Sequence, residues 1–205
     1  MDDVVESGMT EGHPYFATRA EGSHKVPWLG TFELEFATPE LNRVAEVWHA
    51  KRGTHTMPAR RDITIKDLKF ALPGLAFMDL VREGDALRYR VRLMGSLLDE
   101  LVAPMTGKFV DEVVPPHFAT KWAMQWSPAL TDRRPVRAAG RVEFAGRRWY
   151  IAESFYAPLG EDGETPDILM VVAYYHAIEK TEAGPSEVAR RLAAEIEAHC
   201  AEPVS

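Results

Sequence analysis

The sequence is poor in cysteine, in long apolar runs and in familiar enzyme motifs. Its single cysteine, Cys200, excludes an internal disulfide and a cysteine-rich metal site. No apolar run approaches the roughly 20 residues that a membrane-spanning helix needs. The acidic residues 1–3 lack the basic start and apolar stretch of a secretory signal. We therefore expect a cytoplasmic protein with no membrane span.

Positive charge is also scarce. The 205 residues include 24 Lys and Arg against 31 Asp and Glu, a formal net charge of −7. Binding to nucleic acid phosphates normally needs the opposite sign or a segregated basic face, so no nucleic acid partner is expected. Arginines cluster within residues 88–92, 133–137 and 147–148. Because charged side chains are mostly exposed, we interpret them as a solvated sheet face and loop charges.

Motifs for common catalytic and metal sites are absent from the sequence. The chain has no glycine-rich phosphate loop, no HExxH helix and no CxxC pair. It also lacks the GxSxG nucleophile elbow. We therefore predict no catalytic residue and no metal ligand, and the protein is expected not to be an enzyme.

The apolar residues, 46% of the sequence, follow helix and strand periods. Helices are predicted over residues 39–52, 65–72, from 116 onward and from 186 onward. Strands are predicted over residues 75–81, 87–94, 136–145, 148–157 and 168–176, with a possible short strand at 31–36. Thr38 followed by Pro39 predicts a helix start, and Thr64 with Asp67 forms a capping box.

This element order predicts an α+β fold: a five-stranded antiparallel sheet with helices inserted between strands 2 and 3, and flanking helices at both ends. Strand 168–176 is apolar on both faces, so both sheet faces should be covered. The inserted helices would cover one face, and the flanking helices or a second subunit the other. The predicted organisation is an irregular arm over 1–37, a domain over 38–180 and a terminal helix over 181–205.

Strand 87–94 alternates cleanly, which predicts a half-exposed edge strand. Its apolar residues would share one face: Leu87, Tyr89, Val91 and Leu93. Arginines and Met94 would occupy the other face. Gly95 would allow a tight exit from the strand.

Five segments carry a resemblance to a known family. They are Trp48 with Arg52, MPARRDI at 57–63, LPGL at 72–75, RYRVRLMGS at 88–96 and MTGK at 105–108. Over roughly residues 40–178 the sequence is similar to a bacterial single-domain PAS-like family of unknown function. The element order also resembles a PAS domain, a small sensory fold of signalling proteins. The resemblance implies a PAS-type fold and a sensory or regulatory role.

Aromatic residues suggest a cavity between the sheet and its helices, since ligand pockets are mostly apolar with few polar groups. The candidate ligand-binding residues are Tyr89, Val91, His117, Trp122, Trp126, Tyr150 and Glu153. The alternative, a packed aromatic core, is the interpretation that we favour from the sequence. If Glu153 is buried, its carboxylate needs a partner, for which Arg141 or the strand of Arg88 is expected.

No cofactor is predicted. In PAS folds a histidine of the inserted helices can ligate haem, which makes His117 a candidate by resemblance. Cys200 lies in the terminal helix, far from the expected pocket, which excludes flavin–cysteine photochemistry. Arg60 and Arg61 could hold an anionic ligand by bidentate contacts. The alternative is a structural role, in which they pair with a neighbouring charge or contribute to capping the following helix.

Two helices each have a single apolar stripe to bury. The candidate homodimer interface residues are Leu41, Val44 and Trp48 on the first helix and Val188, Leu192 and Ile196 on the last. Together with the PAS resemblance, this predicts a stand-alone PAS-type module that dimerises and acts on an unknown protein partner, with or without a small ligand. The alternatives are a small enzyme or ligand carrier using the cavity with Glu153 or His117, and a purely structural interaction protein.

Overall fold

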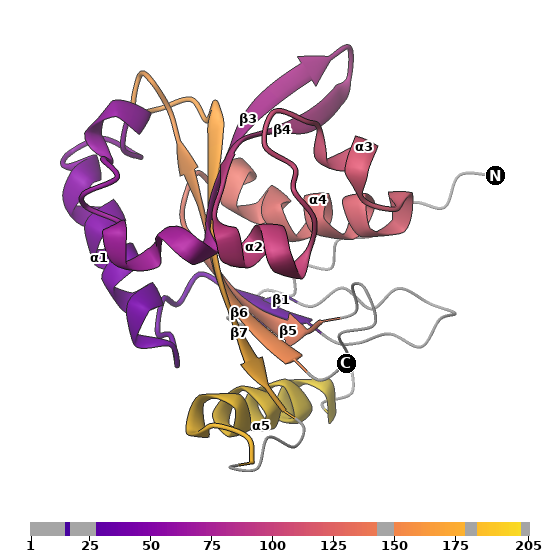
Figure 1. The fold of residues 1–205 in the computed structure, drawn as a ribbon. Coiled ribbons are helices and arrows are strands. Elements are labelled where there is room, and N and C mark those ends of the chain that lie inside the picture. Colours follow the sequence, from indigo (N-terminus) through magenta and orange to yellow (C-terminus); the bar gives the residue numbers. More distant parts are fainter. Residues whose placement is uncertain (1–14, 17–27, 143–149, 179–183, 202–205) are drawn as a thin grey trace.

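An antiparallel sheet runs through the centre of the molecule (Figure 1). The computed structural model describes residues 15–16, 28–142, 150–178 and 184–201. Within these, the strand order is β1-β2-β5-β6-β7-β3-β4. The strands are β1 (Tyr15–Phe16), β2 (Trp28–Thr31), β3 (Leu75–Glu83), β4 (Ala86–Met94), β5 (Val136–Arg141), β6 (Tyr150–Leu159) and β7 (Ile168–Ala177). The helices are α1 (Pro39–Arg52), α2 (Ser96–Leu101), α3 (Val110–Val113), α4 (Pro116–Thr131) and α5 (Glu187–Ala201), with 3₁₀ turns η1 (Arg60–Asp62) and η2 (Lys69–Gly74).

The α+β class with an antiparallel sheet is confirmed, but the predicted number of strands is wrong. The five expected strands are present, and two more extend the sheet beyond β5. β2 pairs with β5 and β1 with β2. The predicted strand at 31–36 begins too late, because the paired residues are 28–31. β2 finds its partner more than a hundred residues away, and no local period reports such a pairing.

β7 is a central strand, as its apolar sequence predicts. It lies between β6 and β3 and pairs with both. Met170 and Val172 face one apolar cluster, whereas Leu169, Val171 and Ala173 face another on the opposite side of the sheet. Both faces are therefore covered by protein, which explains the lack of polar residues over 168–173.

β4 forms the far edge of the described sheet, as expected, but its alternation breaks near its end. The register with β3 shifts between Phe77 and Met78, which leaves Arg92 as an extra residue. A bulge of this kind reverses which face the following side chains occupy. Leu93 therefore packs in the cluster opposite that of Val91, and Met94 takes the face predicted for Leu93.

The two sheet faces carry different helices (Figure 1). α2, α3 and α4 cover the face of Val91 and Tyr156, as predicted for the inserted helices. α1 covers the opposite face near β3, β6 and β7, and α5 covers the same face near β2 and β5. No helix in the described ranges is long and apolar enough to cross a membrane.

The apolar stripes of α1 and α5 pack inside the chain, which corrects their assignment to a dimer interface. Leu41, Val44 and Trp48 are at most 1% exposed, and Trp48 Nε1 donates to the Pro158 carbonyl at 3.0 Å. Leu192 and Ile196 are equally buried, against Leu29, Ala139 and Ile151, with half-buried Val188 packed beside them. The sheet face itself is the partner that these stripes require.

Two predicted helix details differ. The Thr64–Asp67 box forms: the Thr64 N–H donates to Asp67 Oδ2 at 2.8 Å, and the Asp67 N–H donates to the Thr64 hydroxyl at 3.4 Å. The predicted α-helix does not follow this box, however. A turn leads into the 3₁₀ segment η2, in which Pro73 lacks the N–H that an α-helix requires. Thr38 is the N-cap residue of α1 but its hydroxyl does not cap the helix. That hydroxyl instead contacts His176 Nε2 at 2.9 Å.

Gly95 marks a close approach between β4 and η2. A Cβ at this position would lie 2.0 Å from the Leu72 carbonyl oxygen and 2.5 Å from that of Pro73. Its own N–H donates to the Leu75 carbonyl at 2.8 Å. The predicted tight exit is therefore real, but it depends on the missing side chain rather than on an unusual φ.

Candidate functional site

A cavity of about 140 Å³ lies between the sheet and the inserted helices α2, α3 and α4. Most of its wall is apolar, with indole rings from Trp28, Trp122 and Trp126 and thioethers from Met78, Met94 and Met105. Thioethers adapt to irregular shapes and contact aromatic rings favourably. The structure therefore contains a cavity between the sheet and the helices, where the sequence favoured a packed aromatic core.

A row of small residues across three strands makes room for the cavity. Ala138 of β5 is paired with Ser154 of β6, which is paired with Ala173 of β7, and all three line the cavity. Gly140 and Ala152 form a second small pair beside them. Cross-strand neighbours have Cβ atoms only about 5 Å apart, so consecutive small residues leave a hollow on that face.

Gln125 of α4 places a carboxamide at the cavity wall. The residue is 9% exposed, so most of its side chain is buried while its carboxamide lies at the cavity wall. A carboxamide has one acceptor oxygen and two N–H donors, which a ligand in the cavity can use. Sequence reasoning missed Gln125, although its position three residues after Trp122 puts it on the apolar face of the helix.

Two tyrosines add hydroxyl groups to the same wall. Burial raises the pKa of Tyr156 to about 12, although a hydrogen bond with Ser154 acts in the opposite direction. Burial also raises the pKa of Tyr175, with Tyr156 as a second cause. Both phenols are therefore neutral at physiological pH and can donate a hydrogen bond.

The predicted cavity residues divide into two groups. Val91, Trp122 and Trp126 line the cavity. Tyr89 lies behind it, with its ring centroid 4.8 Å from that of Trp126 in a T-shaped contact. The others lie elsewhere: Tyr150 is half-buried near the start of β6, and His117 is exposed with its ring against Phe118. The prediction was right for Trp122 and Trp126 because both lie on the face of α4 that points toward the sheet. His117 lies in the first turn of the helix, and its side chain is exposed.

Glu153 is fully buried on the opposite face of the sheet from the cavity. Its carboxylate accepts hydrogen bonds from the backbone N–H groups of Ala37 and Thr38 at 3.0 and 2.8 Å. Arg137 Nε donates to Glu153 Oε1 at 2.8 Å. The expected need for a partner is confirmed, but the predicted sources, Arg141 and the Arg88 strand, are wrong. The carboxylate thus fixes the backbone that enters α1.

Arg137 links this anchor to the carboxy-terminal helix. Its two terminal nitrogens donate to both carboxylate oxygens of Glu195 in α5, at 2.6 and 2.8 Å. Burial alone would lower the pKa of Arg137, but Glu195 and Glu153 together raise it above its ordinary value. Burial would raise the pKa of Glu195, which Arg137 nevertheless holds below its usual range. Arg137 is 3% exposed, so its assignment to a solvated loop cluster is wrong.

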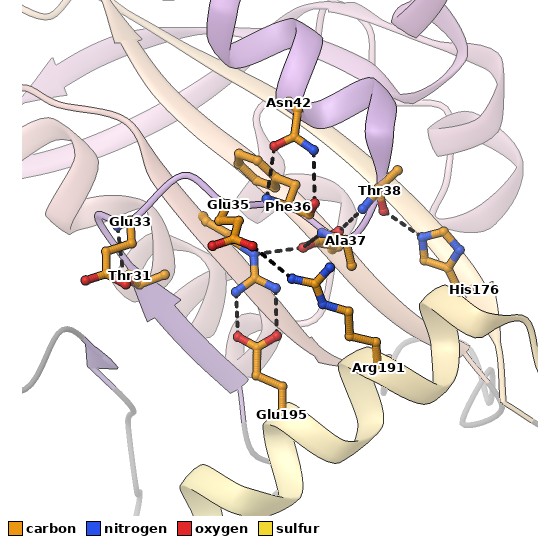
Figure 2. Close-up of polar contacts among 12 residues, drawn as sticks. Thr31, Glu33, Glu35, Phe36, Ala37, Thr38, Asn42, His176, Arg191 and Glu195 are labelled. Atoms are coloured by element: carbon orange, nitrogen blue, oxygen red, sulfur yellow. Dashed lines mark hydrogen bonds and ion pairs between the residues drawn. The ribbon is translucent and has the colours of Figure 1, made fainter.

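Figure 2 shows how these contacts join three parts of the chain. Residues Phe36, Ala37 and Thr38 lie between α1 and the sheet, with Glu195 of α5 below them. Asn42 holds the same segment by donating to the Phe36 carbonyl at 2.9 Å and accepting from its N–H at 3.1 Å. His176 of β7 contacts the Thr38 hydroxyl, and burial lowers the pKa of its imidazole despite the nearby carboxylates of Glu153 and Glu40.

The two candidate anion-binding arginines do not converge. Arg61 forms an exposed ion pair with Glu161. Arg60 donates to the Ile63 carbonyl at 2.6 Å and stacks 4.1 Å above the Phe77 ring. Burial, and then the charge of Arg92, lower the pKa of Arg60. These contacts give Arg60 a packing role, and the pair forms no shared anion site.

Comparisons with known proteins give little further guidance. No family model matches the chain, and no curated protein matches it. Among solved structures, the chain is similar to an RNA-binding light-oxygen-voltage receptor, with 13% identity and a TM-score of 0.37. The match covers 71% of this chain and 42% of that one, so the chain spans less than half the length of the receptor chain. The functional argument therefore rests on the geometry of the cavity and of the sheet.

Proposed function

We propose that the protein is a stand-alone sensory module of the PAS type, in which a small molecule in the cavity sets the state of α1 and α5. One observation carries the proposal: the cavity and the buried anchor of both helices are built on the same two strands. Ala138 and Ser154 line the cavity, and their chain neighbours Arg137 and Glu153 form the anchor. The order of elements, a hairpin, inserted helices and three further strands, is that expected from the PAS resemblance.

The mechanism follows from the alternation of side chains along a strand. A ligand that presses on Ser154 or Ala138 displaces β6 or β5, and the same displacement moves Glu153 or Arg137 on the other face. Glu153 holds residues 37–38 at the start of α1, and Arg137 holds α5. The ligand shifts the equilibrium between two arrangements only by its difference in affinity for them.

The enzyme alternative loses the residues on which it rested. Glu153 faces away from the cavity and is saturated by three donors. His117 is exposed and does not line the cavity. We therefore propose a non-catalytic role. A ligand carrier would use the same cavity, but it would not require the ligand to alter α1 or α5.

Dimerisation and contact with a signalling partner belong to the proposal. Because the apolar stripes of α1 and α5 are buried within the chain, a dimer would form through other surfaces of these helices or of the sheet edges. Native mass spectrometry of the full-length protein measures both the oligomeric state and any bound mass. A dimer with a reproducible additional mass is the expected result.

Hydrogen exchange of a cavity-filled variant tests the relay. Ala173→Leu adds three heavy atoms to the cavity floor and mimics an occupant, whereas Ala173→Ser changes polarity with little added volume. We expect slower or faster exchange in α1 and α5 for Ala173→Leu relative to both the wild type and Ala173→Ser. Changes confined to α2, α3 and α4 would contradict the relay and leave a carrier. Ala138→Met is a second filling variant should Ala173→Leu fail to fold.

A further inference from the structure

The cavity walls specify a class of ligand, and this inference rests on the proposed function because it requires an occupied cavity. The volume of about 140 Å³ is close to that of an engineered apolar cavity of about 150 Å³ that binds benzene. The indoles of Trp122 and Trp126 and the three methionines form the apolar interior. A body the size of one aromatic ring therefore fills it.

The charges on the cavity wall have one sign. Among the described residues that line it, Lys121 and Arg141 are the charged ones, and no lining residue is acidic. The protein as a whole has a net charge of −7, so a wall with only cationic groups departs from its overall balance. Arg141 retains an exposed partner in Glu197, at 3.7 Å. An anion at the cavity mouth would be attracted by both side chains, whereas a cation would be repelled.

Lys121 and Gln125 are arranged to act together. They are four residues apart on α4, so their side chains lie on one face of the helix in successive turns. Lys121 is half-buried and Gln125 is nine-tenths buried, and both line the cavity. A carboxylate is acceptor-only, and it can accept one bond from an ammonium and another from an amide N–H₂.

We propose that the cavity binds a small organic monocarboxylate with an apolar body the size of one aromatic ring. The ring occupies the space between the tryptophans and the small residues of the sheet. The carboxylate lies at the mouth, where Lys121 and Gln125 donate to it and Arg141 contributes charge. A neutral ligand of the same shape gains no charge attraction from Lys121 and Arg141 and binds more weakly.

Titration of the full-length protein with matched probes tests this assignment. Benzoate, benzyl alcohol and benzylamine share a ring and differ in charge, and calorimetry measures their affinities. We expect benzoate to bind at least tenfold more tightly than benzyl alcohol, and benzylamine to bind most weakly. Lys121→Met should reduce the preference for benzoate over the alcohol to threefold or less. Lys69→Met, which replaces an exposed lysine outside the cavity, should leave that preference unchanged.

Gln125→Leu separates the roles of amide and charge. It should weaken benzoate severalfold while leaving benzyl alcohol nearly unaffected, and the thermal midpoint of each variant reports its folding. Equal binding of the three probes, or a preference that survives Lys121→Met, would overturn the carboxylate assignment while leaving the cavity as a ligand site. Binding of none of the probes by protein that carries a different co-purified mass would also overturn it. A protein that binds no probe and carries no additional mass would count against the proposed function itself.

Discussion

Glu153 and Ser154 are consecutive residues of β6 that serve opposite faces of the sheet. Ser154 lines the cavity, and Glu153 is buried beneath the segment that enters α1. On the paired strand β5, Ala138 and Arg137 repeat the arrangement. A displacement of either strand therefore acts on both faces at once.

Removing Arg137 should destabilise the fold strongly. Arg137→Met leaves Glu153 buried with two backbone donors and Glu195 without its bidentate partner, and breaking a buried ion pair typically costs about 3–5 kcal/mol. Arg191→Met removes the exposed pair with Glu35 and should cost less than about 1 kcal/mol. Urea unfolding measures both free energies. Equal losses in the two variants would show that the buried network does not stabilise the fold.

Stability should decline as the pH falls below about 6.5, the ordinary pKa of histidine. Burial lowers the pKa of His176 in the folded protein, so below that pH the unfolded chain binds more protons than the folded one. The stability that neutral His176 contributes is fully present above the pKa that this histidine has in the unfolded chain. It is lost as the pH falls toward the lower pKa of His176 in the folded protein.

The variant His176→Asn tests this assignment, since it can keep a hydrogen bond to Thr38 without titrating. The free energy of unfolding at several pH values between about 5.5 and 7.5 should depend less on pH than in the wild type. His49, whose pKa is lowered by burial and by Arg52, contributes equally to both proteins and cancels. An unchanged slope would exclude His176 as a source of the pH dependence.

Substitution of Trp48 should report on the core rather than on a dimer. Trp48→Ala removes a buried indole and its hydrogen bond to Pro158, with an expected cost of about 3–5 kcal/mol. Val47→Ala, on the half-buried flank of the same helix, should cost less. Thermal unfolding and sedimentation measure stability and oligomeric state together. A monomeric Trp48→Ala variant with wild-type stability would restore α1 as a dimer interface.

Adding one methyl group at Gly95 should be costly. Gly95→Ala places a Cβ against two carbonyl oxygens of η2, and overpacking of this kind costs about 1–3 kcal/mol. Ser96→Ala, the adjacent and exposed position, should remain close to the wild type. Chemical unfolding of the two variants provides the comparison, and a neutral Gly95→Ala would mean that η2 can move away from β4.

The sequence predicted the elements that have regular local periods and missed what depends on pairing. The stripes of α1, α4 and α5 and the central place of β7 follow from spacing along the chain. The addition of β2 and the bulge beside Arg92 depend on partners in other strands, which no single segment reports. The apolar stripes of α1 and α5 were correctly predicted to be buried. The spacing of apolar residues along a helix does not tell, however, whether a second subunit or the chain's own sheet covers them.

The same distinction applies to the site. The tryptophans of α4 were candidates for a cavity wall or a packed core because their spacing puts them on one face, and they line the cavity. The floor of Ala138, Ser154 and Ala173 exists only through cross-strand register, so it was not predicted. Gln125 was visible in principle as one amide on an apolar helix face, and Arg137 as a cation between Val136 and Ala138 in its strand. Both are polar residues at positions where the pattern predicts apolar ones. Gln125 lines the cavity, and Arg137 forms the buried ion pairs.

The paired roles of β5 and β6 also constrain how this chain can change its length. Deleting one residue of β6 ahead of Glu153 would rotate every later side chain to the other face, as strand geometry requires. The carboxylate of Glu153 would then project into the apolar cavity. The hydroxyl of Ser154 would lie beneath the segment that enters α1, where the backbone N–H groups of residues 37 and 38 bind a carboxylate. Insertions and deletions are therefore confined to the connecting loops, and this strand can diverge only by substitution.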